Sequence, residues 1–234
     1  MNEPAQFLEW DSAFFNRRIA MVQGSVIADA KALLEWSKAN RIDCLYFLAA
    51  NDAPTIAAAE SLNFSLTDIR VTHERSLKNL PDRPSDIRVV RPDDVERLKQ
   101  LAAPSFTGSR FYADPHFPRA QCDAMYATWI ERDCLEGRAH VLVTERDGEA
   151  VGFLTCRLDG GVGNMALMAV DPVVQGEGRA RRLIHAALHY CADQGITRST
   201  MVTQARNIAS QRLYQSCGYL IHSTALWYHR WFTA

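Results

Sequence analysis

Two glycines separated by a single residue, Gly176 and Gly178, stand between two segments of opposite character. The segment before them, Met165–Val170, is apolar and ends at the turn-forming pair Asp171-Pro172, which is typical of a strand that leaves a sheet. The segment after them is basic and repeats its apolar residues at helical spacing. Glycines let consecutive N–H groups converge on one point, and the start of a helix adds a positive dipole end. This loop is therefore predicted to bind phosphate or pyrophosphate.

Known glycine-rich phosphate loops differ in the residues that come after their second glycine. A dinucleotide-binding loop needs a third glycine where this chain has Arg181. A Walker loop needs Lys followed by Ser or Thr where this chain has Arg179-Ala180. The remaining match is the pattern Q-x-x-G-x-[GA], formed by Gln175, Gly178 and Ala180. On these residues alone, a glycine-rich turn before an ordinary surface helix stays an alternative.

A second pattern, N-x-x-A-x-x-L-Y-x-x-x-G-[FY], lies beyond the loop. It is matched at Asn207, Ala209, Leu213, Tyr214, Gly218 and Tyr219. The interval between them suits a helix over 178–194, a helix-ending glycine at Gly195 and a strand over 198–203. Together the loop and this pattern resemble the coenzyme A loop and the helix that follows it in the GNAT acetyltransferase superfamily. The resemblance implies a mixed α/β sheet of the GNAT acyltransferase fold, acetyltransferase activity, and acetyl-CoA as cofactor.

Composition and charge exclude several other classes of protein. The 234 residues are 47% hydrophobic and 23% charged, which is typical of a globular chain, and the net charge of −1 creates no field that attracts nucleic acid. The six cysteines are scattered without a C-x-x-C pair, so we expect reduced thiols and no metal site. The N-terminal residues do not resemble a signal peptide, and no apolar run reaches the roughly 18 residues of a membrane span. We therefore expect a cytoplasmic protein.

One break divides the chain. The segment Asn79–Asp86 contains two prolines, so we predict an N-terminal part, 1–80, a linker, 81–86, and a catalytic GNAT domain, 87–234. In the catalytic domain we expect strand 87–91, a helix that opens at Pro92, helix 120–136, strands 140–145, 150–158 and 165–170, helix 178–194, strand 198–203, helix 207–217 and strand 219–230. The pair Asp147-Gly148 predicts a two-residue hairpin turn. The family resemblance implies the same order.

The N-terminal part resembles the end of the catalytic domain. We expect strand 19–27, helix 29–40, strand 44–49, helix 54–62 and strand 64–77. At a constant offset of 155 residues, Glu60–Phe64 aligns with Gln215–Tyr219, and Leu66, Val71 and Arg75 align with Ile221, Leu226 and Arg230. In this register Ala59 stands at the position that corresponds to Tyr214. No glycine-rich loop of the pattern Q-x-x-G-x-[GA] precedes Ala59. Our hypothesis is a partial, degenerate, non-catalytic GNAT-like half that extends the sheet; chance similarity is the alternative.

The family resemblance assigns roles to residues of this sequence. Backbone groups of Met168, Ala169 and Val170 are expected to hold the pantetheine arm, on a strand that usually splays from its neighbour. The loop amides are expected to hold the pyrophosphate; the loop comprises Gln175, Gly176, Glu177, Gly178, Arg179, Ala180 and Arg181. Asn207 is expected to bind the pantetheine side. Tyr214 is the expected general acid, because a phenol with a pKa near 10 can protonate a thiolate whose pKa is about 8.5.

The acceptor is suggested by a narrower resemblance. The segments Leu8–Phe15, Ser109–Pro118, Val202–Asn207 and Ser223–Tyr228 resemble those of acetyltransferases that act on nucleotide-linked amino sugars. This implies a small-molecule acceptor, the 4-amino group of a dTDP-4-amino-4,6-dideoxy sugar. The alternatives are a protein or peptide α-amine, a small free amine, and a non-catalytic acetyl-CoA-binding module.

Residues for the acceptor are expected in the segment Ser109–Pro118. Arg110 suits a nucleotide diphosphate, Asp114 a sugar hydroxyl or amine, and Phe111 or Tyr112 an apolar sugar face. A purely structural loop is the alternative. The apolar C-terminal strand, with its W-Y-H-R-W-F sequence, suggests a homodimer as a further hypothesis.

Overall fold

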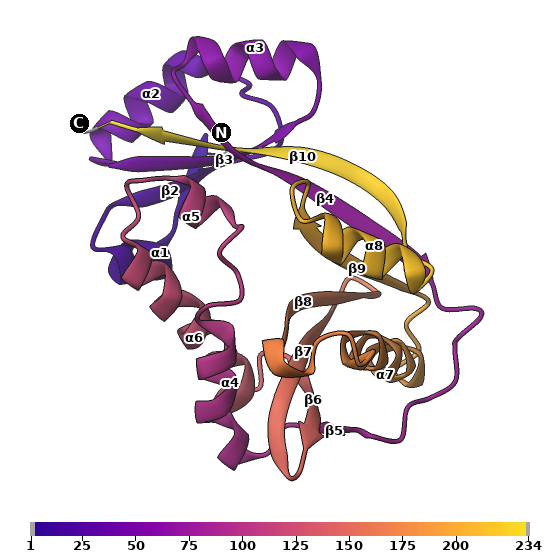
Figure 1. Ribbon diagram of the computed structural model, residues 1–234. Helices are drawn as coiled ribbons and strands as arrows, with labels where there is room; N and C mark the ends of the chain where they lie inside the picture. Colours follow the sequence, from indigo (N-terminus) through magenta and orange to yellow (C-terminus); the bar gives the residue numbers. More distant parts are fainter. Residues whose placement is uncertain (1–2, 233–234) are drawn as a thin grey trace.

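The computed structural model describes residues 3–232 and shows one mixed sheet of ten strands with helices on both sides (Figure 1). In space the strands follow the order β1-β2-β3-β10-β4-β9-β8-β7-β6-β5. They are β1 (Ala5–Phe7), β2 (Ile19–Val22), β3 (Cys44–Ala50), β4 (Ser65–Ser76), β5 (Ile87–Val89), β6 (His140–Arg146), β7 (Glu149–Asp159), β8 (Val162–Val170), β9 (Arg198–Gln204) and β10 (Leu220–Trp231). The helices are α1 (Glu9–Phe15), α2 (Ala30–Ala39), α3 (Ala53–Ser61), α4 (Val95–Ala102), α5 (Arg110–Ala113), α6 (Arg119–Leu135), α7 (Arg179–Asp193) and α8 (Ile208–Ser216). Among these residues no helix is both long and apolar enough to cross a membrane.

The predicted fold class is confirmed, and local sequence signals placed most of the elements. The helix expected over 178–194 is α7, and it is followed by Gly195 in the left-handed region, with φ 75°. The hairpin turn between β6 and β7 also forms where it was predicted. Asp147 and Gly148 have φ values of 53° and 85°, as a turn with two left-handed residues requires.

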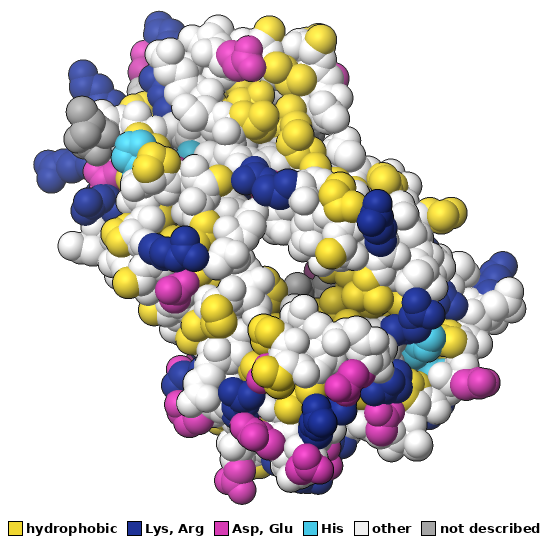
Figure 2. All heavy atoms as spheres, in the orientation of Figure 1, with side chains coloured by type: hydrophobic (Ala, Val, Ile, Leu, Met, Phe, Trp, Pro, Cys, Tyr) yellow, Lys and Arg dark blue, Asp and Glu magenta, His cyan; other side chains and the backbone are white. Residues whose placement is uncertain are grey.

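Strands β8 and β9 are paired over only part of their length. They run parallel, with partners at 162–165 of β8 and 198–201 of β9, although β8 continues to residue 170 and β9 to residue 204. On the other side of β8, Ala166 and Leu167 stand opposite the single residue Thr155, whose hydroxyl accepts the Leu167 N–H at 3.0 Å. Because a bulge bends its strand, β8 turns away from β9 just beyond their last pair. Figure 2 shows an opening through the molecule in this region, with α8 on one side and the segment between α4 and α5 on the other.

The two parts of the chain exchange strands. The last strand, β10, lies between β3 and β4, and β4 from the N-terminal part lies between β10 and β9. Each part therefore completes the portion of the sheet that the other begins. Since residues 225–229 of β10 pair with β3 on one edge and with β4 on the other, this stretch offers no free strand edge to a second copy. The homodimer remains a hypothesis that this strand does not support.

The pairing of β4 with β10 is symmetric at the offset of 155 found in the sequence. Arg70 pairs with Ala225, 155 residues away, and the irregular positions in the two strands, Thr67 and His222, are related by the same offset. The adjoining helices agree: the side chain of Asp52 caps α3 in the same way as that of Asn207 caps α8. These features support the half-repeat hypothesis and the division of the chain at 81–86, which remain proposals.

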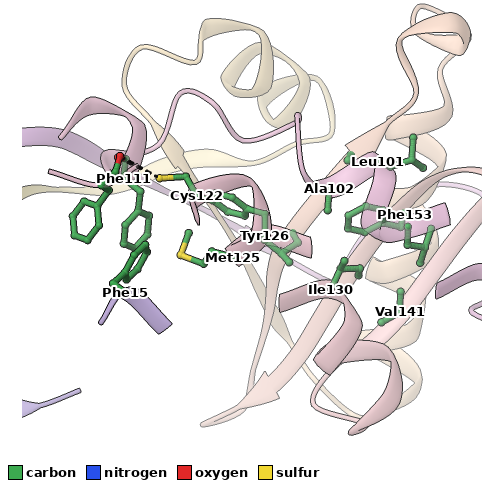
Figure 3. Packing of buried hydrophobic residues seen from close by; sticks show 14 of the residues in the cluster. Phe15, Leu101, Ala102, Phe111, Cys122, Met125, Tyr126, Ile130, Val141 and Phe153 are labelled. Atoms are coloured by element: carbon green, nitrogen blue, oxygen red, sulfur yellow. Dashed lines mark hydrogen bonds between the residues drawn. The ribbon is translucent and has the colours of Figure 1, made fainter. Parts of the chain in front are cut away.

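Apolar packing joins the two parts rather than separating them. In one cluster Phe15, from the N-terminal part, stacks on Phe111 with ring centroids 5.8 Å apart, and Met125 and Phe153 extend the same cluster across α6 and β7 (Figure 3). A second cluster lies between the sheet and α7 and α8. A third includes Tyr228 of β10 among N-terminal residues. Each large apolar side chain buried in this way contributes about 1.5–3 kcal/mol, so the parts stabilise each other.

Some expectations were wrong. The strand predicted over 19–27 ends at Val22, because Gly24 adopts a φ of 80° and the chain bends. The strand predicted over 87–91 ends at Val89. Strand β1, helix α1 and the single turn α5 were not predicted. The N-cap of helix α1 is Leu8, whose side chain cannot accept a hydrogen bond, so the usual signal for the start of a helix is missing.

Candidate active site

The glycine-rich loop forms an open concave surface at the start of α7. Gly176 and Gly178 both lie in the left-handed region, with φ values of 87° and 77°, and Gly178 is the N-cap of α7. A Cβ added at Gly176 would meet no atom within 4 Å. The loop borders a cavity of about 240 Å³ that extends to Leu213 on α8. Glycine here therefore gives the left-handed backbone and leaves the surface open, which fits a bound pyrophosphate group.

The arginines of this loop are held in different ways. Arg179 is mostly buried, and its guanidinium donates to the Thr144 hydroxyl at 3.1 Å and to the Glu145 carbonyl at 2.9 Å. These two hydrogen bonds hold the start of α7 against β6. Arg181 borders the cavity and donates to the hydroxyl of Ser216 on α8 at 3.2 Å. Of these two side chains, Arg181 is the cation better placed for a diphosphate.

A second cavity continues from the loop along the end of β8. It has a volume of about 480 Å³ and is bordered by Met168, Ala169 and Val170 on one side and by the C-terminal half of α4 on the other. Val170 and Gln175 border both cavities. The three residues predicted to hold the pantetheine arm therefore lie on one continuous surface with the phosphate loop, in the segment of β8 that has left β9.

Tyr214 lies where β8 and β9 diverge. Its side chain is 6% exposed, and its hydroxyl is within reach of the hydroxyls of Ser210 and of Thr203, which is in the part of β9 beyond the last pair with β8. Burial raises the pKa of this phenol, and the two hydroxyls offset only part of that effect. The side chain of His73 packs edge-on against the Tyr214 ring, with centroids 5.4 Å apart. Burial lowers the pKa of His73, so a neutral ring borders the phenol and does not promote its ionisation.

Asn207 begins the helix that carries Tyr214. Its side-chain oxygen accepts the Ser210 N–H at 3.1 Å and so caps α8. This bond fixes the amide plane and leaves the NH₂ group as the donor for a ligand. The role predicted for this amide, binding the pantetheine side of the cofactor, remains a proposal.

The segment predicted to bind the acceptor is largely occupied by contacts within the protein. Phe111 and Asp114 are 3% and 4% exposed. The Arg110 guanidinium lies 4.0–4.3 Å from the ring centroids of three aromatic side chains, those of Tyr46, Phe111 and Trp227. Tyr112 donates to the carboxylate of Asp123. The roles predicted for these four residues remain proposals, and the more exposed Arg110 and Tyr112 are the better candidates for direct contact.

Asp114 is the centre of a buried polar network that joins the segment 110–116 to β10. Its Oδ2 accepts from His229 Nδ1 at 2.6 Å and from Trp231 Nε1 at 2.9 Å, and Arg110 donates to His229 Nε2 at 2.7 Å. Burial lowers the pKa of His229 from 6.5 to about 4, although the bond to Asp114 opposes the shift. Burial alone would raise the pKa of Asp114, but the bonds from His229, Trp231 and His116 hold it below its usual value. The histidine is therefore neutral beside an ionised aspartate.

Sequence reasoning missed several residues that shape the site. Thr203 and His73 reach Tyr214 from separate strands, and Arg97 fixes the end of β8 by donating to Asp171 at 2.5 Å. Of these residues, only Thr203 could have been predicted from the sequence, because it lies inside the strand between the two family patterns. His73 and Arg97 become neighbours of the site only through the strand exchange and the packing of α4.

Comparisons with known proteins agree with this geometry. The Acetyltransferase (GNAT) family profile matches residues 96–219. The dTDP-fucosamine acetyltransferase of Escherichia coli O6:H1 is 28% identical over 95% of this chain and 96% of its own length. The spore coat polysaccharide biosynthesis protein SpsD of Bacillus subtilis is 33% identical over 60% of this chain, which spans 48% of that relative's length. A GCN5-related N-acetyltransferase from Sphaerobacter thermophilus has a TM-score of 0.68 and 15% identity, covering 98% of this chain and 76% of its own.

The matched residues include both sequence patterns, and the matched structure shares the sheet that carries them. The chain therefore belongs to the GNAT family of acetyltransferases, whose cofactor is acetyl-CoA.

Proposed function

We propose that this enzyme acetylates the amine of a nucleotide-linked amino sugar of the dTDP-4-amino-4,6-dideoxy type. The observation that carries the proposal is the relative that acts on such a sugar, whose similarity extends over 95% of this chain and includes the N-terminal part. That part supplies β4 and His73 to the site. A similarity confined to the cofactor loop would support membership of the family but would not indicate which acceptor the enzyme uses.

The proposed reaction is direct transfer within a complex of both substrates. When bound, acetyl-CoA supplies an activated acetyl group. Tyr214 holds a proton at its Oη for the sulfur that leaves as the amine nitrogen bonds to the acetyl carbon, and it takes back the proton that the acetylated nitrogen gives up. Its raised pKa keeps the phenol protonated between turnovers up to alkaline pH. The loop amides and Arg181 bind the diphosphate of the cofactor, and Asn207 orients the arm. The divergence of β8 and β9 lets the amine approach from the face opposite the loop.

The test is thiol release from acetyl-CoA with a panel of acceptors. The panel contains dTDP- and UDP-linked 4-amino sugars, free small amines and short peptides. We expect turnover with a nucleotide-linked amino sugar and little with the others. Turnover with peptides or free amines alone would contradict the proposed acceptor. No turnover with any member, while acetyl-CoA still binds, would contradict the acceptor and favour the non-catalytic binding module.

A further inference from the structure

A third cavity borders the same strand at the opposite end of the diverging segment. Its volume is about 350 Å³, and Ala166 and Leu167, the two bulged residues of β8, form part of its lining. The cofactor cavities border residues 168–175 instead. This cavity and the cofactor cavities therefore border opposite ends of one segment of β8, residues 166–170.

The lining of this cavity is cationic and aromatic. Three arginines, Arg132, Arg138 and Arg157, belong to this lining. Arg157 pairs with Asp133. Arg132 and Arg138 both pair with Glu136, so the three cations outnumber the two carboxylates by one. Two tryptophans, one from α1 and one from α6, stand beside the arginines with their ring centroids 6.0 Å apart. Planar guanidinium groups suit phosphate oxygens, and indole faces suit a nucleobase.

One polar group in the cavity has no partner within the described residues of the protein. Asp133 is 1% exposed, and its Oδ1 accepts from Arg157 at 2.5 Å. Its Oδ2 is buried without a hydrogen-bond partner among residues 3–232. Because an unpaired buried carboxylate oxygen is costly, a donor group on a ligand in the adjoining cavity would stabilise this oxygen.

We propose that this cavity binds the nucleoside diphosphate portion of the acceptor. Trp10 and Trp129 contact the base, the arginines bind the diphosphate, and Asp133 Oδ2 accepts a hydroxyl or N–H of the nucleoside. The proposal rests on the proposed function, since it gives the nucleotide of that acceptor a place. It also assigns the diphosphate to this cavity in place of Arg110, whose guanidinium is enclosed by aromatic rings.

The arrangement also accounts for how the sugar meets the acetyl group. A nucleotide seated against Ala166 and Leu167 directs its sugar along β8, toward residues 168–170 that border the cofactor cavity. The two diphosphates then occupy separate cationic surfaces at the two ends of the same strand segment. Binding of one substrate consequently does not exclude the other.

The test is the affinity of thymidine 5′-diphosphate for the protein saturated with coenzyme A, measured by titration calorimetry. Arg138→Gln and Arg157→Gln should each weaken binding about 10-fold to 100-fold, since each removes a charge-assisted contact. Arg83→Gln is the matched control, because Arg83 is similarly exposed and forms an ion pair with Asp193 away from the cavity. Its affinity should not change. Thermal melting shows that each variant is folded.

Two further results would overturn the assignment. Inorganic pyrophosphate that binds as tightly as the nucleotide would show an unspecific anion site. A nucleotide-linked amino sugar acetylated with the same KM by wild type, Arg138→Gln and Arg157→Gln would show that the acceptor binds elsewhere, while the proposed function stands. The converse outcome is that both variants weaken nucleotide binding while wild type fails to acetylate the amino sugar. That result would support nucleotide binding in this cavity and contradict the proposed function.

Discussion

Acidification should destabilise this protein mainly through His229. The imidazole is 1% exposed and accepts from Arg110 at Nε2, so it cannot take up a proton there without losing that bond and placing two cations together. Its pKa in the folded protein is about 4, against 6.5 for an ordinary histidine. Between these two values the unfolded chain binds a proton that the folded protein does not, so stability falls as the pH falls through this window.

The magnitude is given by linkage. Between about pH 7.5 and pH 5, a histidine whose pKa drops from 6.5 to about 4 on folding costs about 2 kcal/mol of unfolding free energy. Asp114, whose pKa is held below its usual value, stays ionised in the folded protein across this range, so the stability it contributes is lost only at lower pH. His73 is buried and its pKa is also lowered, so it adds a loss of the same sign.

The assay is urea unfolding of wild type and His229→Gln at about pH 7.5 and pH 5. Glutamine can donate to Asp114 and accept from Arg110 without titrating, so the variant should lose about 2 kcal/mol less than wild type over this range. His222→Gln, which changes an exposed histidine of the same strand, should behave like wild type. If His229→Gln loses stability as steeply as wild type, the neutral, buried state assigned to His229 is wrong.

Two further predictions concern single positions in the core and the site. A Cβ at Gly163 would lie 2.3 Å from Cys191 Sγ, so Gly163→Ala should cost about 1–3 kcal/mol in urea unfolding, and adding Cys191→Ala should recover part of it. Gly108→Ala, where a Cβ meets nothing within 4 Å, is the control, and an equal cost at both positions would refute the steric account. Asn207→Ala removes the cap of α8 and should cost about 1 kcal/mol, whereas Asn207→Asp keeps the cap but removes the amide donor. Calorimetry with acetyl-CoA should show weaker binding for both variants; unchanged affinity in Asn207→Asp would remove the ligand contact assigned to this residue.

The parts of the fold that sequence predicted are those set by neighbouring residues. The loop glycines and the turn at Asp147-Gly148 each have a local chemical cause, and both adopt the left-handed backbone that was expected of them. The offset of 155 residues also indicated the relation between β4 and β10. It did not indicate that the two strands change places in the sheet, because pairing partners are chosen by packing over the whole chain.

The site shows the same division. Tyr214 and the loop could be proposed from the sequence because they lie within two short patterns. The network of Asp114 joins side chains 115 residues apart, and neither its sequence neighbours nor those of His229 indicate the contact. The third cavity draws Trp10, Trp129 and Arg157 from three separate segments. The bulged residues Ala166 and Leu167 add the strand side of this cavity, and no local pattern predicted that bulge.

The central claim is that acetyl transfer occurs where β8 and β9 diverge, with Tyr214 as the proton donor. The most direct measurement compares thiol release by wild type and Tyr214→Phe, together with the affinity of each for acetyl-CoA. Phenylalanine keeps the packing against His73 and removes only the hydroxyl, so kcat should fall about 10-fold to 100-fold while the acetyl-CoA affinity stays the same. The high-pH limb of the wild-type rate should lie above pH 10, because burial raises the pKa of this phenol. An unchanged kcat in the folded variant would contradict the account.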